Sequence, residues 1–183
     1  MPDLAWVVLS YRLPREPSRL RLAVWRRLKR LGALVRHDAL WLLPADARAR
    51  EAFEWLAEEV EELGGTALAF EARSFGAEQD RSLVAAFRAE ADERYVGLAE
   101  SARGIGRLAA RRRAVPASVL QQASRQLAGL ERALRLERRR DYFRAPGRDA
   151  AEEALRAAMA VLSARLGAPS ALDWRGVSRA VGD

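Results

Sequence analysis

Residues 4–14 have the sequence Leu4-Ala-Trp-Val-Val-Leu-Ser-Tyr-Arg-Leu-Pro14, and the fold is built outward from this stretch. Its aliphatic, β-branched and aromatic side chains predict a central strand over Leu4–Leu13. A proline-containing loop follows, and the next residues predict a helix from Ser18 to Leu31, with Ser18 as its N-cap and Gly32 as the residue that ends it. Apolar residues recur along one side of this helix, at Leu20, Val24, Leu28 and Leu31.

The following residues predict two short strands, a second helix and a fourth strand. The short strands are expected at Ala33–Arg36 and Ala39–Leu43, joined by a turn at His37-Asp38 in which His37 is exposed. The second helix is expected over Asp46–Leu63 and the last strand over Thr66–Phe75. This order is typical of the ferredoxin-like βαββαβ sandwich, an α+β fold in which two helices cover one face of an antiparallel sheet.

The rest of the chain is predicted to be almost wholly helical. Apolar residues recur from Ser82 to about Arg113, then from Leu120 to Leu134, and again in a helix that ends at Leu166. Asp149-Ala-Ala-Glu152 resembles a capping box at the start of that last helix. The spacing predicts an antiparallel three-helix tail that packs on its own chain or forms a homodimer. We therefore expect a ferredoxin-like domain at 1–76 and a helical hairpin or bundle at 77–183.

Composition excludes several classes of protein. The 183 residues contain no cysteine and one histidine, His37, so neither thiolate chemistry nor a metal site built from histidines can be assembled. No set of nucleophile, base and orienting residue is visible in the sequence either, so catalysis is not expected. No apolar run approaches the ~20 residues of a membrane span, and no signal peptide opens the chain. We expect a cytoplasmic, non-enzymatic protein with no cofactor, no metal and no membrane association.

The charge balance indicates an anionic partner. The chain has 32 basic and 25 acidic residues, a formal net charge of +7 and a pI of about 10.9, and a strongly basic pI is typical of proteins that bind polyanions. Lys29 is the only lysine. The excess of arginine is therefore also what a GC-rich genome would place on an ordinary solvated surface.

The predicted helix at Ser18–Leu31 carries the most suggestive cations. Four of them lie opposite its apolar line and are candidates for contact with duplex DNA, namely Arg19, Arg26, Lys29 and Arg30. Arg27 falls inside the apolar arc, so we expect its side chain either to extend to the edge of the sheet or to form an ion pair.

A second candidate site lies just before this helix. Arg12 and Arg15, together with the backbone amides near Ser18, form a candidate cradle for a small oxyanion such as chromate or sulfate.

Two further basic clusters lie in the helical tail. One is Arg111-Arg112-Arg113, and the other lies between Arg132 and Arg140. In the second cluster the nucleic-acid candidates that share a helical face are Arg132, Arg135 and Arg139. A charge run can equally be a solvated face, and the two readings stay open. Stacking on single strands is not expected, because Trp6, Trp25 and Trp41 lie on or near the predicted sheet and should pack.

Five stretches carry a family resemblance. They are Trp6-Val-Val-Leu-Ser-Tyr-Arg-Leu-Pro14, Val24-Trp25-Arg26-Arg27-Leu28, Leu40-Trp41-Leu42-Leu43-Pro44, Trp55-Leu56-Ala57, and Arg140-Asp141-Tyr142-Phe143 with Pro146. Together they resemble the N-terminal domain of ChrB, the chromate-resistance regulatory protein. The resemblance implies a regulatory protein of the chromate-resistance type, either a DNA-binding transcriptional regulator or an accessory to one. Full-length ChrB proteins carry a second, C-terminal domain that would begin where this chain ends, so a separate protein with that domain is an expected partner.

The βαββαβ unit also resembles CRISPR-adaptation endonucleases and the C-terminal part of PaaX-type repressors. Those nucleases place a metal-binding aspartate at the end of the first strand, whereas here Tyr11 is followed by Arg12. A cation cannot act as a ligand for Mg²⁺, so nuclease activity is not expected. Two alternatives to a DNA-binding regulator remain: a domain that senses chromate or sulfate without contacting DNA, and a helical module for protein interaction or dimerisation.

Overall fold

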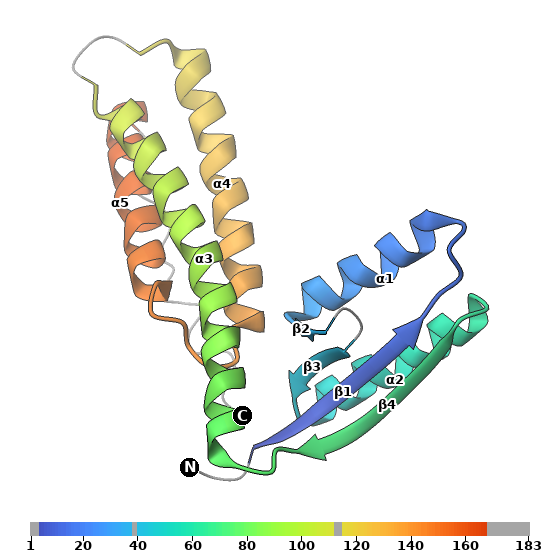
Figure 1. Cartoon of the computed structure of the whole chain (residues 1–183). Helices are drawn as coiled ribbons and strands as arrows, with labels where there is room; N and C mark the ends of the chain where they lie inside the picture. The colour runs from blue at the N-terminus through green and yellow to red at the C-terminus, as the bar shows by residue number, and fades with distance from the viewer. Residues whose placement is uncertain (1–3, 38–39, 112–114, 168–183) are drawn as a thin grey trace. The chain divides into compact units, whose positions relative to one another are not determined.

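The computed structural model describes residues 4–37, 40–111 and 115–167, which form two compact units (Figure 1). The sheet unit comprises residues up to 90 together with 140–144, and the helical unit comprises 91–139 and the residues from 145 onward. These units do not coincide with the domains expected at 1–76 and 77–183, which stay a prediction. The elements are β1 (Ala5–Arg12), α1 (Ser18–Leu31), β2 (Leu34–Arg36), β3 (Leu40–Pro44), α2 (Ala47–Glu62), β4 (Thr66–Arg73), α3 (Ala77–Ala109), α4 (Ala117–Arg140) and α5 (Arg148–Leu166).

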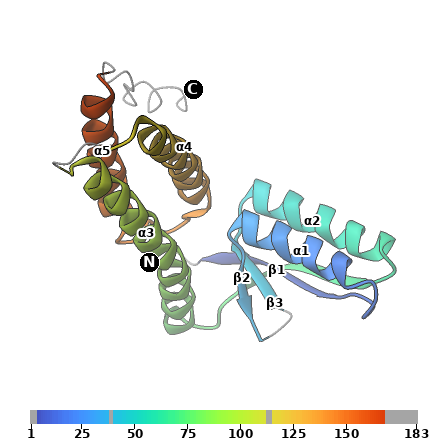
Figure 2. The same ribbon diagram turned by 90° about the horizontal axis from the view of Figure 1, so that it is seen from above.

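The sheet unit contains a four-stranded antiparallel sheet with the strand order β2-β3-β1-β4. The central strand β1 pairs on both sides, and Val7 lies opposite Leu43 of β3 and Glu71 of β4. Helices α1 and α2 cover the same face of the sheet (Figure 2). Their apolar lines pack on the inward side chains of β1 and β3, so that Val24 and Phe53 are completely buried. The expected α+β class is confirmed.

The opposite face of the sheet packs against the beginning of α3. Trp6 and Val8 point to this side and contact Val84 and Phe87, because side chains alternate between faces along a strand. The Trp6 and Phe87 rings stack with their centroids 5.8 Å apart. Phe143 adds a third ring, 5.5 Å from Phe87. The sheet is thus covered on both faces around its central strand.

The helix ends show where local signals were sufficient. Helix α1 has the predicted bounds, and Gly32 ends it with φ at +77°, in the left-handed region that favours glycine. Ser18 is not the N-cap, which is a correction: Pro17 holds that position and no side chain caps the helix. In α2, by contrast, the Asp46 carboxylate accepts a 2.6 Å hydrogen bond from the amide of Ala49.

The helical unit packs α3, α4 and α5 around one shared core. Tyr95, Leu127 and Leu155 are buried there, one from each helix, so these helices bury their apolar faces within their own chain. The predicted capping box is wrong, because α5 begins at Arg148 with Gly147 as its N-cap. Residues 140–144, between α4 and α5, belong to the sheet unit instead. Among the described residues no helix is long and apolar enough to cross a membrane.

Candidate nucleic-acid interface

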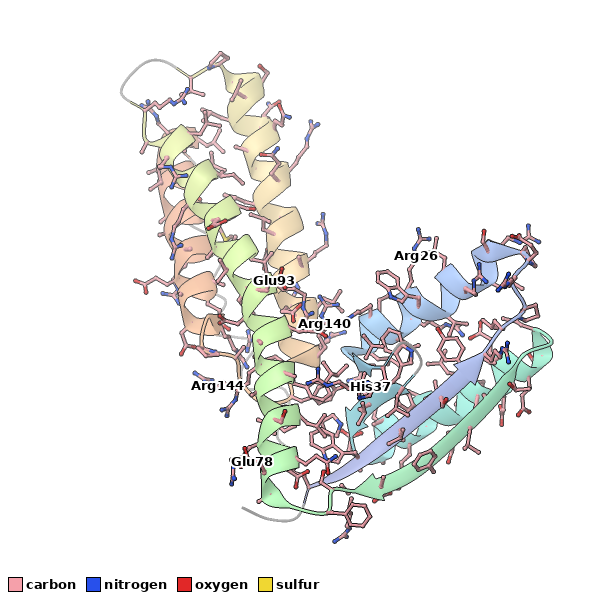
Figure 3. All side chains as sticks on the ribbon, in the orientation of Figure 1. Arg26, His37, Glu78, Glu93, Arg140 and Arg144 are labelled. Carbon is pink, nitrogen blue, oxygen red and sulfur yellow. The ribbon has the colours of Figure 1, made fainter. Side chains whose placement is uncertain are left out.

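Three arginines lie along the exposed face of α1. Arg19, Arg26 and Arg30 are exposed to solvent, as expected from their position opposite the apolar line. In the part of the chain that the structure describes, none of the three has a carboxylate partner. Figure 3 shows Arg26 projecting away from the ribbon. These guanidinium groups are therefore available to an anionic ligand.

Lys29, the fourth predicted contact, is held within the sheet unit. Its ammonium nitrogen lies 2.9 Å from a carboxylate oxygen of Glu90 and 5.8 Å from the centre of the Trp41 ring. The two charges are both about 30% exposed, at 29% for Lys29 and 32% for Glu90, so the pair is only partly screened by water. A phosphate would have to compete with Glu90 for this lysine, so that the exposed face of α1 offers three cations rather than four.

Arg27 confirms the expectation of an ion pair at the edge of the sheet. Its guanidinium donates to the carboxylate of Glu59 on α2, while the side chain stays 53% exposed. The aliphatic stem thus lies along the apolar arc while the charged end reaches water and its partner. This pair joins the two helices that cover the sheet.

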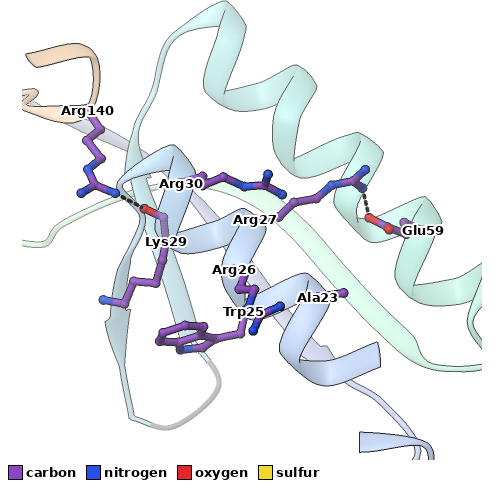
Figure 4. A pocket seen from close by; sticks show the side chains of 8 residues that line it. All are labelled: Ala23, Trp25, Arg26, Arg27, Lys29, Arg30, Glu59 and Arg140. Carbon is purple, nitrogen blue, oxygen red and sulfur yellow. Dashed lines mark hydrogen bonds and ion pairs between the residues drawn. The ribbon is translucent and has the colours of Figure 1, made fainter. Parts of the chain in front are cut away.

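The exposed side of α1 is hollowed, and we call this feature the α1 hollow. It has a volume of about 550 Å³ and is lined by Ala23, Trp25, Arg26, Arg27, Lys29, Arg30, Glu59 and Arg140. In Figure 4, Trp25 lies between Lys29 and Arg26 on one side of α1, whereas Arg27 and Arg30 extend toward α2. The hollow therefore combines an aromatic ring with several cations.

The expectation that Trp25 packs is wrong, although it holds for Trp6 and Trp41. Trp6 and Trp41 are 2% and 3% exposed, but Trp25 is 46% exposed. The signal was present in the sequence: at 100° per residue, Trp25 lies away from the line that Leu20, Val24 and Leu28 define. The exposure of Trp25 follows from its helical position and not from its aromatic character.

The C-terminal end of α1 is capped by the last residue of α4 and by the segment that follows it. The Arg140 guanidinium donates to the carbonyl of Lys29 at 2.9 Å, and the Tyr142 hydroxyl donates to the carbonyl of Leu31 at 2.8 Å. Burial raises the pKa of the Tyr142 phenol, which keeps it protonated as a donor. Both bonds are made to carbonyls in the last turn of α1, where the regular helical pattern of hydrogen bonds ends, and the Lys29 carbonyl also accepts from the amide of Gly32 at 3.2 Å.

At the predicted oxyanion cradle of Arg12, Arg15 and Ser18, two of the backbone amides have partners within the protein. Both arginines are exposed, but the amide of Ser18 donates to the carboxylate of Glu16 at 3.3 Å. An incoming oxyanion would therefore meet a negative charge at that amide. The amide of Leu20 is also used, because it donates to the carbonyl of Pro17.

Some basic residues of the helical unit have carboxylate partners and others do not, as on α1. Arg132 and Arg139 are exposed and have no carboxylate partner among the described residues, whereas Arg135 pairs with Glu131 one turn earlier. In the other cluster Arg111 is exposed, and residues 112–113 lie outside the described residues. Two of the three predicted contacts in this unit are thus free.

No candidate metal site is found where the structure describes the chain. It contains no cluster of three or more histidine, aspartate or glutamate side chains that could hold a metal ion. The turn residue His37 is exposed, as predicted, and has φ at +47°. Arg12 lies at the exposed end of β1.

These features define an α+β protein with a sheet flanked by helices and an exposed arginine row on its first helix. The sequence model of the family described as "Protein ChrB, N-terminal" matches residues 21–165, which is most of the chain. The chain belongs to this family, which connects it with chromate resistance. No curated protein and no solved structure matches it significantly.

Proposed function

We propose that this protein is a transcriptional regulator of the chromate-resistance type, or an accessory to one, that binds duplex DNA through α1. The observation that carries the proposal is the row of exposed arginines at Arg19, Arg26 and Arg30, which have no carboxylate partner in the part of the chain that the structure describes. Helical spacing of seven and four residues keeps the three on one face. The net charge of +7 favours the approach of a polyanion.

The length of this row suits a nucleic-acid backbone. Arg19 and Arg30 are eleven residues apart, which corresponds to about 16 Å along a helix that rises 1.5 Å per residue. Duplex DNA carries roughly ten negative charges over that distance. Each arginine can therefore contact a different phosphate without a change in the helix.

Three finer attributes are part of the proposal. The element order and the strand order β2-β3-β1-β4, with two helices on one face, support a ferredoxin-like arrangement for residues 5–73. A non-enzymatic role is also part of the proposal, since the one histidine of the chain, His37, is an exposed turn residue. A cytoplasmic location is the third attribute that we propose.

The test is an anisotropy titration of a labelled random duplex between about 50 and 200 mM salt, where phosphate contacts weaken strongly. In the double variant Arg26→Ala/Arg30→Ala, we expect the slope of log K against log salt to fall by about 2, since each lost contact releases roughly one counterion fewer. The matched control is Arg50→Ala/Arg81→Ala, which loses the same charge from arginines already paired with Glu71 and Glu78.

The control should change the slope far less than Arg26→Ala/Arg30→Ala. Absence of binding by the unaltered protein at low salt would overturn the proposal. Equal weakening in both double variants would overturn the role of α1, because only the net charge would then matter.

A further inference from the structure

Trp25 places an exposed aromatic ring in a basic surface. The proposed contacts between arginines and phosphates do not use this ring. It is 46% exposed, and Leu22, one turn earlier on α1, is 43% exposed. Next to these two apolar side chains, Arg21, Arg26 and Arg27 of α1 are exposed as well. A tryptophan left in water on a charged helix costs solvation free energy, so a partner that covers the ring would be favoured.

Among the described residues, Trp25 has no ring-ring or cation-π partner. Lys29, the only lysine, is directed to Glu90 and to the Trp41 ring. The ring-ring contacts involve Trp6, Phe87, Tyr142 and Phe143. The exposed part of Trp25 is therefore free of aromatic and cationic partners within the described chain.

The ring and the free cations belong to the same hollow. Trp25, Arg26 and Arg30 all line the α1 hollow, and neither arginine has a carboxylate partner among the described residues. Arg26 lies beside the Trp25 ring, whereas Arg30 extends toward α2 (Figure 4). Its volume of about 550 Å³ lies within the roughly 300–1,000 Å³ of small-ligand sites. Proteins that bind single strands combine the same two elements, a basic track for the backbone and aromatic rings for the bases.

We propose that Trp25 stacks on an unpaired base of nucleic acid while Arg26 and Arg30 contact the adjoining phosphates. The inference rests on the proposed function and specifies its ligand: α1 binds DNA with an exposed base more tightly than fully paired duplex. Bases in an intact duplex are stacked on each other and reach a protein ring only after costly extrusion. The gain from Trp25 therefore arises only where a base is already free.

The test compares three labelled DNAs of identical flanking sequence: a paired duplex, the same duplex with one bulged base, and the single strand. Affinities are measured by anisotropy for the full chain and for Trp25→Phe and Trp25→Leu. A stacked base contributes about 5- to 150-fold in affinity. The unaltered protein and Trp25→Phe should prefer the bulged duplex by at least about fivefold, and Trp25→Leu, which keeps apolar bulk without a ring, should lose that preference.

The outcomes separate this inference from the proposed function. If the bulged duplex is not preferred, or if Trp25→Leu keeps the preference, stacking is overturned while binding to the paired duplex still supports the DNA-binding role. If none of the three DNAs binds, both proposals fail. Equal competition by polyglutamate would show that the hollow accepts any polyanion and would also overturn base stacking. Urea unfolding of each Trp25 variant verifies that the exposed substitution leaves the fold intact.

Discussion

The Arg140 guanidinium donates a 2.9 Å hydrogen bond to the backbone carbonyl of Lys29, a residue 111 positions earlier in the chain. Tyr142 makes the same kind of contact with Leu31. The last turn of α1 is thus held by a segment that is distant in the sequence. These two hydrogen bonds fix the end of the helix that carries Arg26 and Arg30, although neither arginine takes part in them. The close approach of Arg140 to the end of α1 leaves no space for a side chain at residue 32.

Residue 32 is a glycine, and a substitution of Gly32 tests how much the contact between Arg140 and the end of α1 contributes to stability. A Cβ atom at residue 32 would lie 2.6 Å from the Cβ of Arg140, and the backbone there has φ at +77°. We expect Gly32→Ala to lower the free energy of unfolding by about 1–2 kcal/mol from the left-handed backbone alone. Displacement of Arg140 should add to this loss. Urea unfolding followed by circular dichroism measures the total.

Gly64→Ala is the matched control for this substitution. Gly64 has the same φ of +77°, but an added Cβ there meets nothing within 4 Å. It therefore reports the backbone cost without the collision. Equal losses in the two variants would show that the approach of Arg140 to Gly32 has no energetic weight.

The features that could be predicted from the sequence are those that depend on residues close together in the chain. The bounds of α1 follow from a proline-rich entry, a regular apolar line and a terminal glycine, all of which act within a few residues. The position of Glu90 beside Lys29 depends on packing between segments 61 residues apart, and no local pattern encodes it. The same holds for Arg140 at the end of α1. Trp25 is different, because helical geometry placed it outside the core.

The Asp80 carboxylate accepts hydrogen bonds from residues at the start of β1 and just after β4. We therefore expect the free energy of unfolding to depend on pH in the acidic range. The Ser74 hydroxyl and the Trp6 indole N–H donate to the same Asp80 oxygen at 2.7 and 2.9 Å, and these bonds lower the pKa of Asp80 from its ordinary value. A lowered pKa in the folded state contributes stability that is complete above the unfolded pKa of about 3.9 and is lost as pH falls through the folded value.

We therefore expect Asp80→Asn to be less stable than the unaltered protein near neutral pH. The difference in unfolding free energy should stay constant above about pH 5 and narrow below about pH 4, because the native carboxylate then takes up a proton. Urea midpoints at several pH values give this profile. A difference that does not vary with pH would contradict the role of the charge, and Ser74→Ala should show a smaller version of the same dependence.

Glu137 is a buried acid within the helical unit, and it forms an ion pair with Arg94. Its side chain is 2% exposed, and its carboxylate accepts from Arg94 at 2.8 Å. Removal of one partner from a buried pair typically costs about 3–5 kcal/mol. Because Arg94 is 31% exposed, we expect Arg94→Ala to fall at the lower end, at about 3 kcal/mol. Arg135→Ala, which breaks the more exposed pair with Glu131 on α4, should cost only about 0.5 kcal/mol. Similar losses of unfolding free energy in Arg94→Ala and Arg135→Ala, measured by urea unfolding, would contradict the conclusion that burial of Glu137 makes its ion pair the more important of the two.

Arg132 and Arg139 test whether the helical unit also contacts DNA. They share a face of α4 at seven-residue spacing and are free of carboxylate partners among the described residues, unlike Arg135. If both contact phosphates, Arg132→Ala/Arg139→Ala lowers the slope of log K against log salt by about 2, in addition to the loss from Arg26→Ala/Arg30→Ala. Arg125→Ala/Arg156→Ala removes the same charge from other exposed positions of the unit and should change the slope less. Equal slopes for the two double variants would assign the arginines of α4 to a solvated face and leave α1 as the only proposed contact.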